Sequence, residues 1–437
     1  MLHFRRIVPA LFLNLLVLTL SPAYVLASLI YTPNTFGLSA RGIGLANALT
    51  GDDEDLALAY FNPAALSETR GLDFGGGYMY SIPRLSGGLV GGSRIEERRN
   101  NRIVFLGLKG NISELFVKEP SFRLGLGMNV ACDNNFTKMM AFSDLRSADG
   151  EFYRYGYTNL VLQAALGVGI TDWLSAGLGF HSGFRGKGRV ITWADVSGGT
   201  SNEGTEMSGS LHPVPLGGLY LHHATWGIGA TYREETYGSF ESIDVTATPL
   251  IQGLKLPTMY IPMDFLDTFV PREVAAGVSW RVLPTLKLLA DVTWEQWSRY
   301  AEIAKSVRFV GSHSTFETID IWSPRVGAEY KPVENLDIRV GYQYEESPFL
   351  GIGTRFTTPG REDIIGKVIL DNDAHVMCAG VGYTLPENET MIPDVTFDAS
   401  YQYHYMVPRT AVSHDGYKFE SEGGLHLLSA SVKFWFH

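Results

Sequence analysis

The sequence predicts an all-β fold: a 14-stranded antiparallel transmembrane β-barrel with an N-terminal plug inside its lumen. Three observations predict it. Apolar and polar residues alternate strictly in segments of about ten residues, the length of a tilted strand that crosses a bilayer. The connections between these segments are alternately long and short, as in barrels of bacterial outer membranes. Beyond the first residues, no apolar run reaches the roughly 18 residues that a transmembrane helix needs.

Residues 1–27 have the pattern of a secretory signal peptide. Arg5 and Arg6 precede an apolar stretch at 10–20, and a small-residue exit follows. This stretch is too short to span a bilayer as a helix. We therefore expect the mature chain to begin near Ser28 and to be exported.

Residues 28–70 differ from the rest of the chain, because they are rich in small residues and lack a strand pattern. Their Leu, Ala, Ile and Phe content favours folding inside the barrel over hanging in the periplasm, so we interpret them as a plug. The acidic run Asp52–Asp55 lacks the spaced oxygen ligands and the glycine of a calcium loop. We therefore expect no metal there, but a turn that is solvated or paired with arginine.

Residues 71–437 form the predicted barrel. In the segment 336–345, apolar residues at the even positions oppose Asp337 and Arg339. One face therefore suits lipid and the other suits a lumen. The same pattern predicts strands at 72–80, 101–110, 121–130, 158–169, 173–184, 211–222, 225–236, 271–282, 285–298, 321–331, 336–345, 374–385, 395–406 and 425–436.

The connections and glycines agree with a barrel. Thr171-Asp172, His223-Ala224 and Leu283-Pro284 are examples of the short connections. Because the strand count is even, we expect both termini on the periplasmic side of a Gram-negative outer membrane. Pairs of glycines that share one face of a strand would let side chains or the plug approach the wall. These pairs are Gly125/Gly127, Gly167/Gly169, Gly177/Gly179 and Gly227/Gly229.

Composition restricts the partners. The chain has 46 acidic and 35 basic residues and a formal net charge of −11, which disfavours nucleic-acid binding because that requires a basic face. Cys132 and Cys378 could form a disulfide after export, but two cysteines are not a disulfide framework, so we expect thiols. No Gly-x-Ser-x-Gly elbow occurs, and no residue spacing indicates a cofactor or an enzyme.

The long predicted loop at 237–270 is unusually apolar for a barrel that carries polar solutes. Either it forms a groove for a hydrophobic ligand or it packs on neighbouring loops. The residues that would line the groove are Leu250, Ile251, Leu254, Leu256, Met259, Phe265 and Phe269.

Four landmarks in order carry a family resemblance. The segment 39–48 is followed by Asn62-Pro63-Ala64, then by two tryptophans before a serine in 291–298, and then by Arg325-Val326-Gly327 and Arg339-Val340-Gly341. This order resembles the outer-membrane long-chain fatty acid transporter family, which includes aromatic-hydrocarbon uptake proteins. The last strand, which ends at Phe436, resembles the signal read by the barrel-assembly machinery.

The resemblance implies passive uptake of a hydrophobic small molecule, a long-chain fatty acid or a hydrocarbon. A loop groove would capture the ligand, an apolar pocket would receive it, and a hatch at Asn62, Pro63 and Ala64 would shift to open the way. Exit would be lateral, through a kinked strand near 122–130. A fatty acid would also need a basic partner in the lumen, with Arg325, Arg339 and Lys433 as candidates.

Other readings remain open at this point. A secretion-associated or adhesive outer-membrane barrel without small-molecule transport is the main alternative, and a polar-solute porin is another. For the barrel itself we expect a monomer surrounded by outer-membrane lipid and lipopolysaccharide, and built by the barrel-assembly machinery.

Overall fold

The computed structural model describes most of the chain. The described residues are 32–92, 94–97, 100–113, 122–133, 151–152, 161–195, 200–251, 254–255, 259–300, 313–315, 318–350, 355–358, 361–365, 369–386, 393–412 and 418–436. The signal peptide that the sequence predicts at 1–27 lies outside them.

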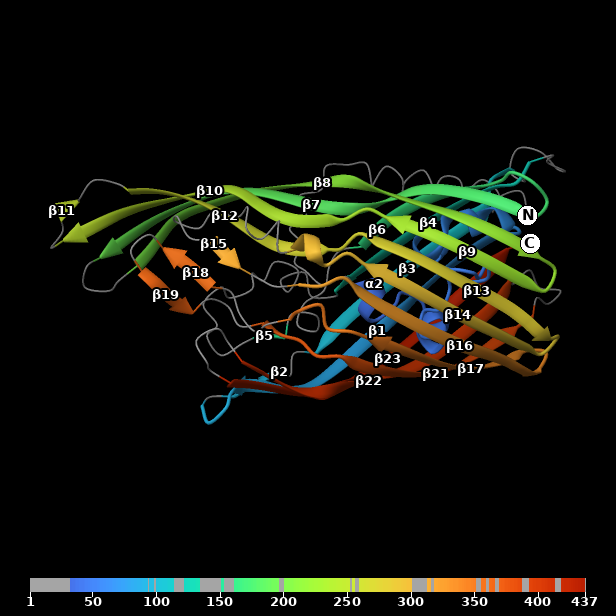
Figure 1. The fold of residues 1–437 in the computed structure, drawn as a ribbon. Coiled ribbons are helices and arrows are strands. Elements are labelled where there is room, and N and C mark those ends of the chain that lie inside the picture. Colours follow the sequence, from blue (N-terminus) through green and yellow to red (C-terminus); the bar gives the residue numbers. More distant parts are fainter. Residues whose placement is uncertain are drawn as a thin grey trace.

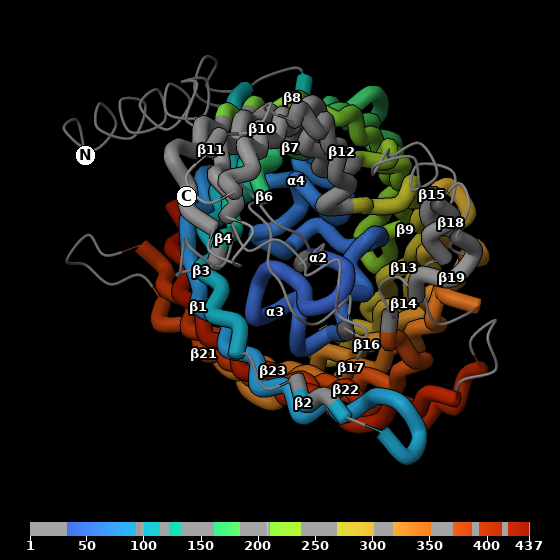
Figure 2. Tube along the Cα trace, turned by 90° about the vertical axis from the view of Figure 1, so that its left-hand side faces the viewer, coloured from blue at the N-terminus to red at the C-terminus, as the bar shows by residue number. Residues whose placement is uncertain are grey.

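Within the described residues, fourteen antiparallel strands pair in chain order, and β23 pairs with β1 to close a barrel (Figures 1 and 2). The predicted barrel is therefore confirmed. The strands are β1 (Leu72–Leu89), β3 (Asn101–Asn111), β4 (Leu124–Asp133), β6 (Val161–Gly169), β7 (Leu174–Asp195), β8 (Thr200–His223), β9 (Trp226–Arg233), β13 (Glu273–Leu283), β14 (Leu286–Glu295), β16 (Ile321–Val333), β17 (Leu336–Glu345), β21 (Ala374–Leu385), β22 (Asp394–Val412) and β23 (Lys418–Phe436).

The two-residue alternation of the sequence is the alternation of the two barrel faces. Along β9, exposed and buried residues alternate without a break from Trp226 to Arg233. The exposed positions of the wall carry aliphatic and aromatic side chains, and most inward positions of β14, β16 and β17 are polar. Cross-strand pairs share a face, so this arrangement gives the barrel a continuous apolar exterior.

The two ends of the barrel differ. We call the end with the short connections 170–173, 224–225 and 284–285 the turn end, and the opposite end the loop end. The chain enters β1 and leaves β23 at the turn end (Figure 1). At the loop end, β7, β8 and β22 continue well past the strands that the sequence predicts.

The prediction of a loop at 237–270 is wrong, because this segment contains strands. β10 (Thr236–Ile251) and β12 (Met259–Val270) form an antiparallel hairpin, with β11 (Leu254–Lys255) between them. β10 also pairs in parallel with β7 from residue 185 to 195. The pairing of β6 with β7 ends at His181, which leaves this edge of β7 open to another strand. The hairpin thus joins an extension that projects from the loop end (Figure 1).

The remaining elements are short. β2 (Arg94–Glu97) pairs with the end of β1. Three strands, β15 (His313–Thr315), β18 (Arg355–Thr358) and β19 (Arg361–Ile365), form a small sheet, and β5 (Glu151–Phe152) pairs with β20 (Ile369–Leu370). Among the described residues, no helix is both long and apolar enough to cross a membrane. Cys132 on β4 and Cys378 on β21 are thiols, as expected.

Candidate functional site

The N-terminal segment 32–70 lies inside the ring of strands (Figure 2), and nearly all of its side chains are buried. It contains α2 (Thr32–Thr35), α3 (Ala40–Gly44), α4 (Leu58–Phe61) and the 3-10 helix η1 (Pro63–Glu68). Ser39 caps α3 by accepting a hydrogen bond from the Gly42 N–H at 2.9 Å. Helices this short gain little stability from their own hydrogen bonds, so contacts with the wall must hold them in place.

Glycines of the wall receive the backbone of the segment. A Cβ at Gly125, Gly177 or Gly229 would overlap the backbone of Leu66, of Pro63 and Ala64, or of Thr50. Six of the eight glycines that the sequence singles out meet the segment, five of them through its backbone and Gly127 through its side chains, which confirms their predicted role. Of the other two, Gly169 meets the Arg123 side chain, which the prediction also allows, and Gly179 meets β6.

A second glycine surface holds residues 44–46. A Cβ at Gly341 would lie 2.6 Å from the Ala46 nitrogen and 2.9 Å from the Ala46 Cβ. One at Gly327 would lie 2.9 Å from the Leu45 oxygen, and one at Gly380 would lie 3.2 Å from the Gly44 Cα. Since β16, β17 and β21 each offer a glycine to residues 44–46, the segment rests on bare backbone here.

The Asn62-Pro63-Ala64 motif connects the segment to β8. The Asn62 side-chain amide donates to the Thr50 carbonyl at 2.9 Å and to the Leu219 carbonyl of β8 at 3.1 Å. Its Oδ1 accepts from the Ala64 N–H at 3.1 Å and so caps η1, with Pro63 as the first helical residue. One buried asparagine therefore fixes the fold of the segment and its position on the wall.

A layer of charges joins the segment to the wall near the turn end. Arg41 contacts Asp52 at 2.6 Å and Asp55 at 3.7 Å within the segment, and Glu329 of β16 at 3.1 Å. Lys287 of β14 also pairs with Asp52. Burial alone would raise the pKa of Asp52, but the two cations outweigh burial and hold this pKa well below its ordinary value. The acidic run is thus paired with arginine, one of the two outcomes that the sequence predicts.

A polar latch joins the segment to the loop half of the wall. Arg233 of β9 binds Glu273 of β13 at 2.6 Å and donates to the Tyr60 carbonyl at 3.1 Å. Its guanidinium also lies 4.2 Å from the centre of the Tyr60 ring. Asn34 donates to Glu273 and accepts from the Tyr60 hydroxyl. The latch, defined as Asn34, Tyr60, Arg233 and Glu273, is buried throughout. Sequence reasoning missed it, because its four residues carry no shared motif.

The three predicted carboxylate partners have different surroundings. Arg339 binds Glu329 at 2.6 Å, Asp337 at 3.3 Å and also Asp398, so three carboxylates already surround it. The Lys433 ammonium is buried 3.6 Å from the centre of the Trp435 ring. Neither is presented to a ligand in this arrangement.

Arg325 is the exception among the three. It is 4% exposed on the inner face of β16, and its Nη1 donates to the Thr293 hydroxyl at 3.1 Å. Among the residues that the structure describes, its Nε and Nη2 have no hydrogen-bond partner. A buried donor without an acceptor costs about 1–3 kcal/mol, which an anionic group in the lumen would recover. Arg325 stands beside Asp291 and Gln343 in the strand register.

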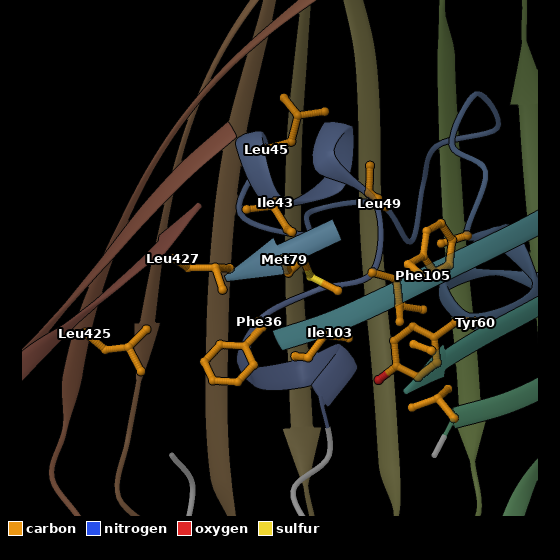
Figure 3. Close-up of a cluster of buried hydrophobic side chains, with 14 of the residues drawn as sticks. Phe36, Ile43, Leu45, Leu49, Tyr60, Met79, Ile103, Phe105, Leu425 and Leu427 are labelled. Atoms are coloured by element: carbon orange, nitrogen blue, oxygen red, sulfur yellow. The ribbon is translucent and has the colours of Figure 1, made fainter. Parts of the chain in front are cut away.

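An apolar cluster fills another part of the lumen (Figure 3). Inward residues of β1, β3 and β23 pack against the N-terminal segment, although the lumen of a water-filled barrel is polar. The residues of this apolar cluster that come from the wall include Met79, Ile103, Phe105, Leu425 and Leu427, and those from the segment include Phe36, Ile43, Leu45, Leu49 and Tyr60. One feature of the sequence could have indicated this cluster. From Leu425 to Leu428 the alternation of β23 weakens, because apolar residues occupy both faces.

The predicted ligand groove is described only in part. Leu250, Ile251, Leu254, Met259 and Phe265 lie on β10, β11 and β12. Leu256 lies outside the described residues. Phe269 is buried at the end of β12, where its ring lies 5.7 Å from that of Trp297 and 5.3 Å from that of Tyr300. Phe349 packs against Trp297 and Tyr300, so four rings form a cluster at the loop end.

The predicted kinked strand is β4. Its pairing with β3 runs from residue 125 to 133 and its pairing with β6 from 124 to 131, without a register shift. Its Gly125 and Gly127 instead receive Leu66 of the segment. In this structure the wall is thus continuous at β4.

Comparison with known proteins agrees with the barrel and its lumen. A family model for outer membrane protein transport proteins (OMPP1/FadL/TodX) matches residues 216–436. Alkane uptake protein A of Marinobacter nauticus is 26% identical over 434 residues, which cover 91% of this chain and 90% of that protein.

Solved structures share the architecture. A FadL homologue of Pseudomonas aeruginosa has a TM-score of 0.59 at 15% identity, over 92% of this chain and 98% of its own. The toluene transporter TodX of Pseudomonas putida has a TM-score of 0.53 at 12% identity, over 92% of this chain and 99% of its own. At these identities the likeness shows the fold alone. Because the family model covers half of the sequence, the chain belongs to the OMPP1/FadL/TodX family of outer membrane transport proteins.

Proposed function

We propose that this protein takes up hydrophobic small molecules, long-chain fatty acids or hydrocarbons, across the outer membrane by passive diffusion. The observation that carries the proposal is the apolar cluster inside the barrel, because a lumen for water-soluble compounds has no use for buried Phe105, Leu425 and Leu427. An alkyl chain gains roughly 0.8 kcal/mol for each CH₂ that leaves water. Alkanes and toluene are named as the cargo of two of the similar proteins, which supports this class of ligand.

In this proposal the loop end faces the outside and the turn end faces the periplasm. The extension built by β7, β8, β10 and β12 would meet the ligand first. The groove predicted from Leu250 to Phe269 stays part of this proposal, because the hairpin carries most of its residues. The barrel would act as a monomer in outer-membrane lipid and lipopolysaccharide, after insertion by the barrel-assembly machinery.

The N-terminal segment is the hatch of this proposal. It fills the lumen next to the apolar cluster, and glycine contacts, charge pairs and the latch hold it. A ligand that reaches the cluster packs on the same side chains as Phe36 and Tyr60, so it competes with the segment for them. Displacement of 60–66 would uncover Gly125 and Gly127 of β4, and lateral exit into the membrane would follow there. The continuous pairing of β4 describes the closed state in this scheme.

Arg325 sets the choice between acidic and neutral ligands. Among the described residues its buried Nε and Nη2 have no hydrogen-bond partner, and an ionised carboxylate there would form a charge-assisted hydrogen bond. A hydrocarbon would occupy the apolar cluster alone. Fatty acids would therefore bind to both features, and alkanes to one.

Equilibrium binding of radiolabelled hexadecane, oleate and toluene to the purified barrel tests the proposal. Leu427 and Leu428 are neighbours on β23 that face opposite sides, since Leu427 is 0% exposed in the lumen and Leu428 is 50% exposed outside. We expect saturable binding that Leu427→Asn weakens about tenfold and that Leu428→Asn leaves unchanged. Absence of saturable binding for all three ligands would reject uptake, and equal effects of the two substitutions would place the site outside the lumen.

A further inference from the structure

We propose that a groove on the membrane-facing surface of the barrel binds one acyl chain of a phospholipid. The groove lies over β1, β21, β22 and β23 and has a volume of about 640 Å³. It is outside the lumen and separate from the apolar cluster. The residues that shape it are Gly76, Tyr78, Val381, Phe397, Ala399 and Ala430.

Strand register explains why a groove forms at this place. Tyr78 pairs with Ala430, Ala430 with Ala399, and Ala399 with Val381, so these residues form one row across four strands. The next row runs from Gly76 through Val432 and Phe397 to Tyr383. Residues in register share a face, so small side chains form the floor and large ones form the rim. The large side chains are exposed on the outside: Tyr78 42%, Phe397 47% and Tyr383 47%.

The chemistry of the lining selects an alkyl chain. Asp398 is the acidic residue that borders the groove, but its carboxylate is buried and binds Arg339 on the lumen side. The described lining of the groove therefore offers a headgroup no charged partner. Exposed apolar side chains of the same wall surround it, including Phe74 and Leu428, so its surface continues the lipid-facing exterior.

The lumen does not supply the occupant. Behind the groove, Leu56 of the N-terminal segment packs on the inner side of Gly75 and Gly107. β1 pairs with β23 over its whole length and with β3 from residue 72 to 81, and neither pairing contains a register shift. Because the wall is closed here, a chain enters the groove from the membrane.

The position favours a phospholipid. Gly76 lies four residues from Leu72, where β1 begins at the turn end. With the orientation proposed above, this depth is the periplasmic leaflet, in which glycerophospholipids and not lipopolysaccharide reside. Moving a lipid chain from its neighbours into the groove brings no hydrophobic gain, since both surroundings are apolar. A chain in the groove is stabilised by contacts with the aromatic rim, and we expect lipid to occupy the groove several times more often than other parts of the wall.

Photo-crosslinking tests this site. The full-length barrel is reconstituted in phosphatidylethanolamine and phosphatidylglycerol vesicles that contain a phospholipid with a diazirine on its acyl chain, and labelled peptides are mapped by mass spectrometry. We expect peptides with 397–399 and 430–432 to carry at least about three times the label of the β13 peptide with 276–278. Ala399→Phe fills the floor of the groove and should remove this excess, whereas Ala276→Phe, on the outer face of β13, should not.

Three results would overturn the site. Even labelling around the barrel would mean an ordinary lipid annulus, and an excess that survives Ala399→Phe in a barrel with folded, heat-modifiable electrophoretic mobility would exclude the groove. Loss of the excess on addition of hexadecane would assign the groove to the transported ligand instead. Binding of hexadecane in the lumen, measured separately, reports on the proposed function, and Ala399→Phe should leave it unchanged.

Discussion

Gly341→Ala should loosen the N-terminal segment without harm to the wall. The new methyl group would lie 2.6 Å from the Ala46 nitrogen, 2.7 Å from the Leu45 carbonyl carbon and 2.9 Å from the Ala46 Cβ. All three atoms are backbone or Cβ atoms, which no rotamer change can move. A normal contact with carbon requires about 3.3–3.6 Å, so residues 45 and 46 must shift by several tenths of an ångström.

The magnitude follows from the contacts that this shift disturbs. Overpacking of a buried site by one methyl group costs about 1–3 kcal/mol. The wall is folded in both states, so the effect of the methyl group on strand stability cancels, and partial relaxation leaves a net cost to attachment of the segment of about 1–2 kcal/mol. Every 1.4 kcal/mol is a factor of ten, which makes the displaced state roughly five to thirty times more populated.

Hydrogen–deuterium exchange measures this population directly. The amides of Ile43, Leu45 and Asn47 are protected by hydrogen bonds within the segment, at 2.9, 3.2 and 2.8 Å. We expect their exchange to accelerate by about five- to thirtyfold in Gly341→Ala. Gly217→Ala on β8 is the matched control, because its Cβ would have ordinary contacts of 3.4 and 3.6 Å. Equal exchange in the two variants, both folded, would refute the view that bare backbone on the wall holds the segment.

Three further results are expected. Arg325→Gln should weaken oleate binding by at least about tenfold and leave hexadecane binding unchanged, because only the acid can use the unpartnered N–H groups; equal weakening of both would contradict this role. The pKa of Asp52 is held below its ordinary 3.8, so the stability that its ion pairs give the segment is fully present above that pH and is lost only as pH falls through the lowered value. The hydrogen–deuterium exchange rate of peptide 50–56, corrected for intrinsic rates, should therefore be constant from pH 8 to 5. Loss of protection within this range would contradict the pairing. Glu273→Gln leaves Arg233 buried without its carboxylate, which costs the attachment of the segment about 3 kcal/mol. Peptide 58–62 should therefore exchange about a hundredfold faster. Unchanged protection would show that the latch does not hold the segment.

The strands of the wall could be predicted from the sequence. β17 and β21 have the bounds that the alternation predicts, and Leu72, Asn101 and Ile321 begin strands at the predicted residues. Each strand of a membrane barrel must satisfy a local rule, apolar outside and mixed inside, so a two-residue period suffices to locate it. The hairpin of β10 and β12 was missed because its partner is the open edge of β7, which no local pattern in 237–270 indicates.

The candidate site was predictable in part. Asn62-Pro63-Ala64 and the acidic run could be singled out because each is a short local motif. The partners could not: Arg41 meets Glu329 across 288 positions of sequence, and Asn34 meets Glu273 across 239. Arg325, Arg339 and Lys433 look alike in sequence, as inward cations. Their surroundings differ, because neighbouring strands bring carboxylates to Arg339 and a tryptophan ring to Lys433. Among the described residues, no acceptor meets the Nε and Nη2 of Arg325.

By itself, the sequence determined that this chain forms a membrane-spanning wall, because lipid on one side imposes the alternation residue by residue. The tertiary structure alone decided what the wall encloses. Met79, Ile103 and Leu427 come from three strands, and they become one apolar surface only when β1 pairs with β23 and the N-terminal segment packs among them. Closure of the barrel brings residues from the two ends of the chain together, and such contacts produce no periodic pattern in the sequence.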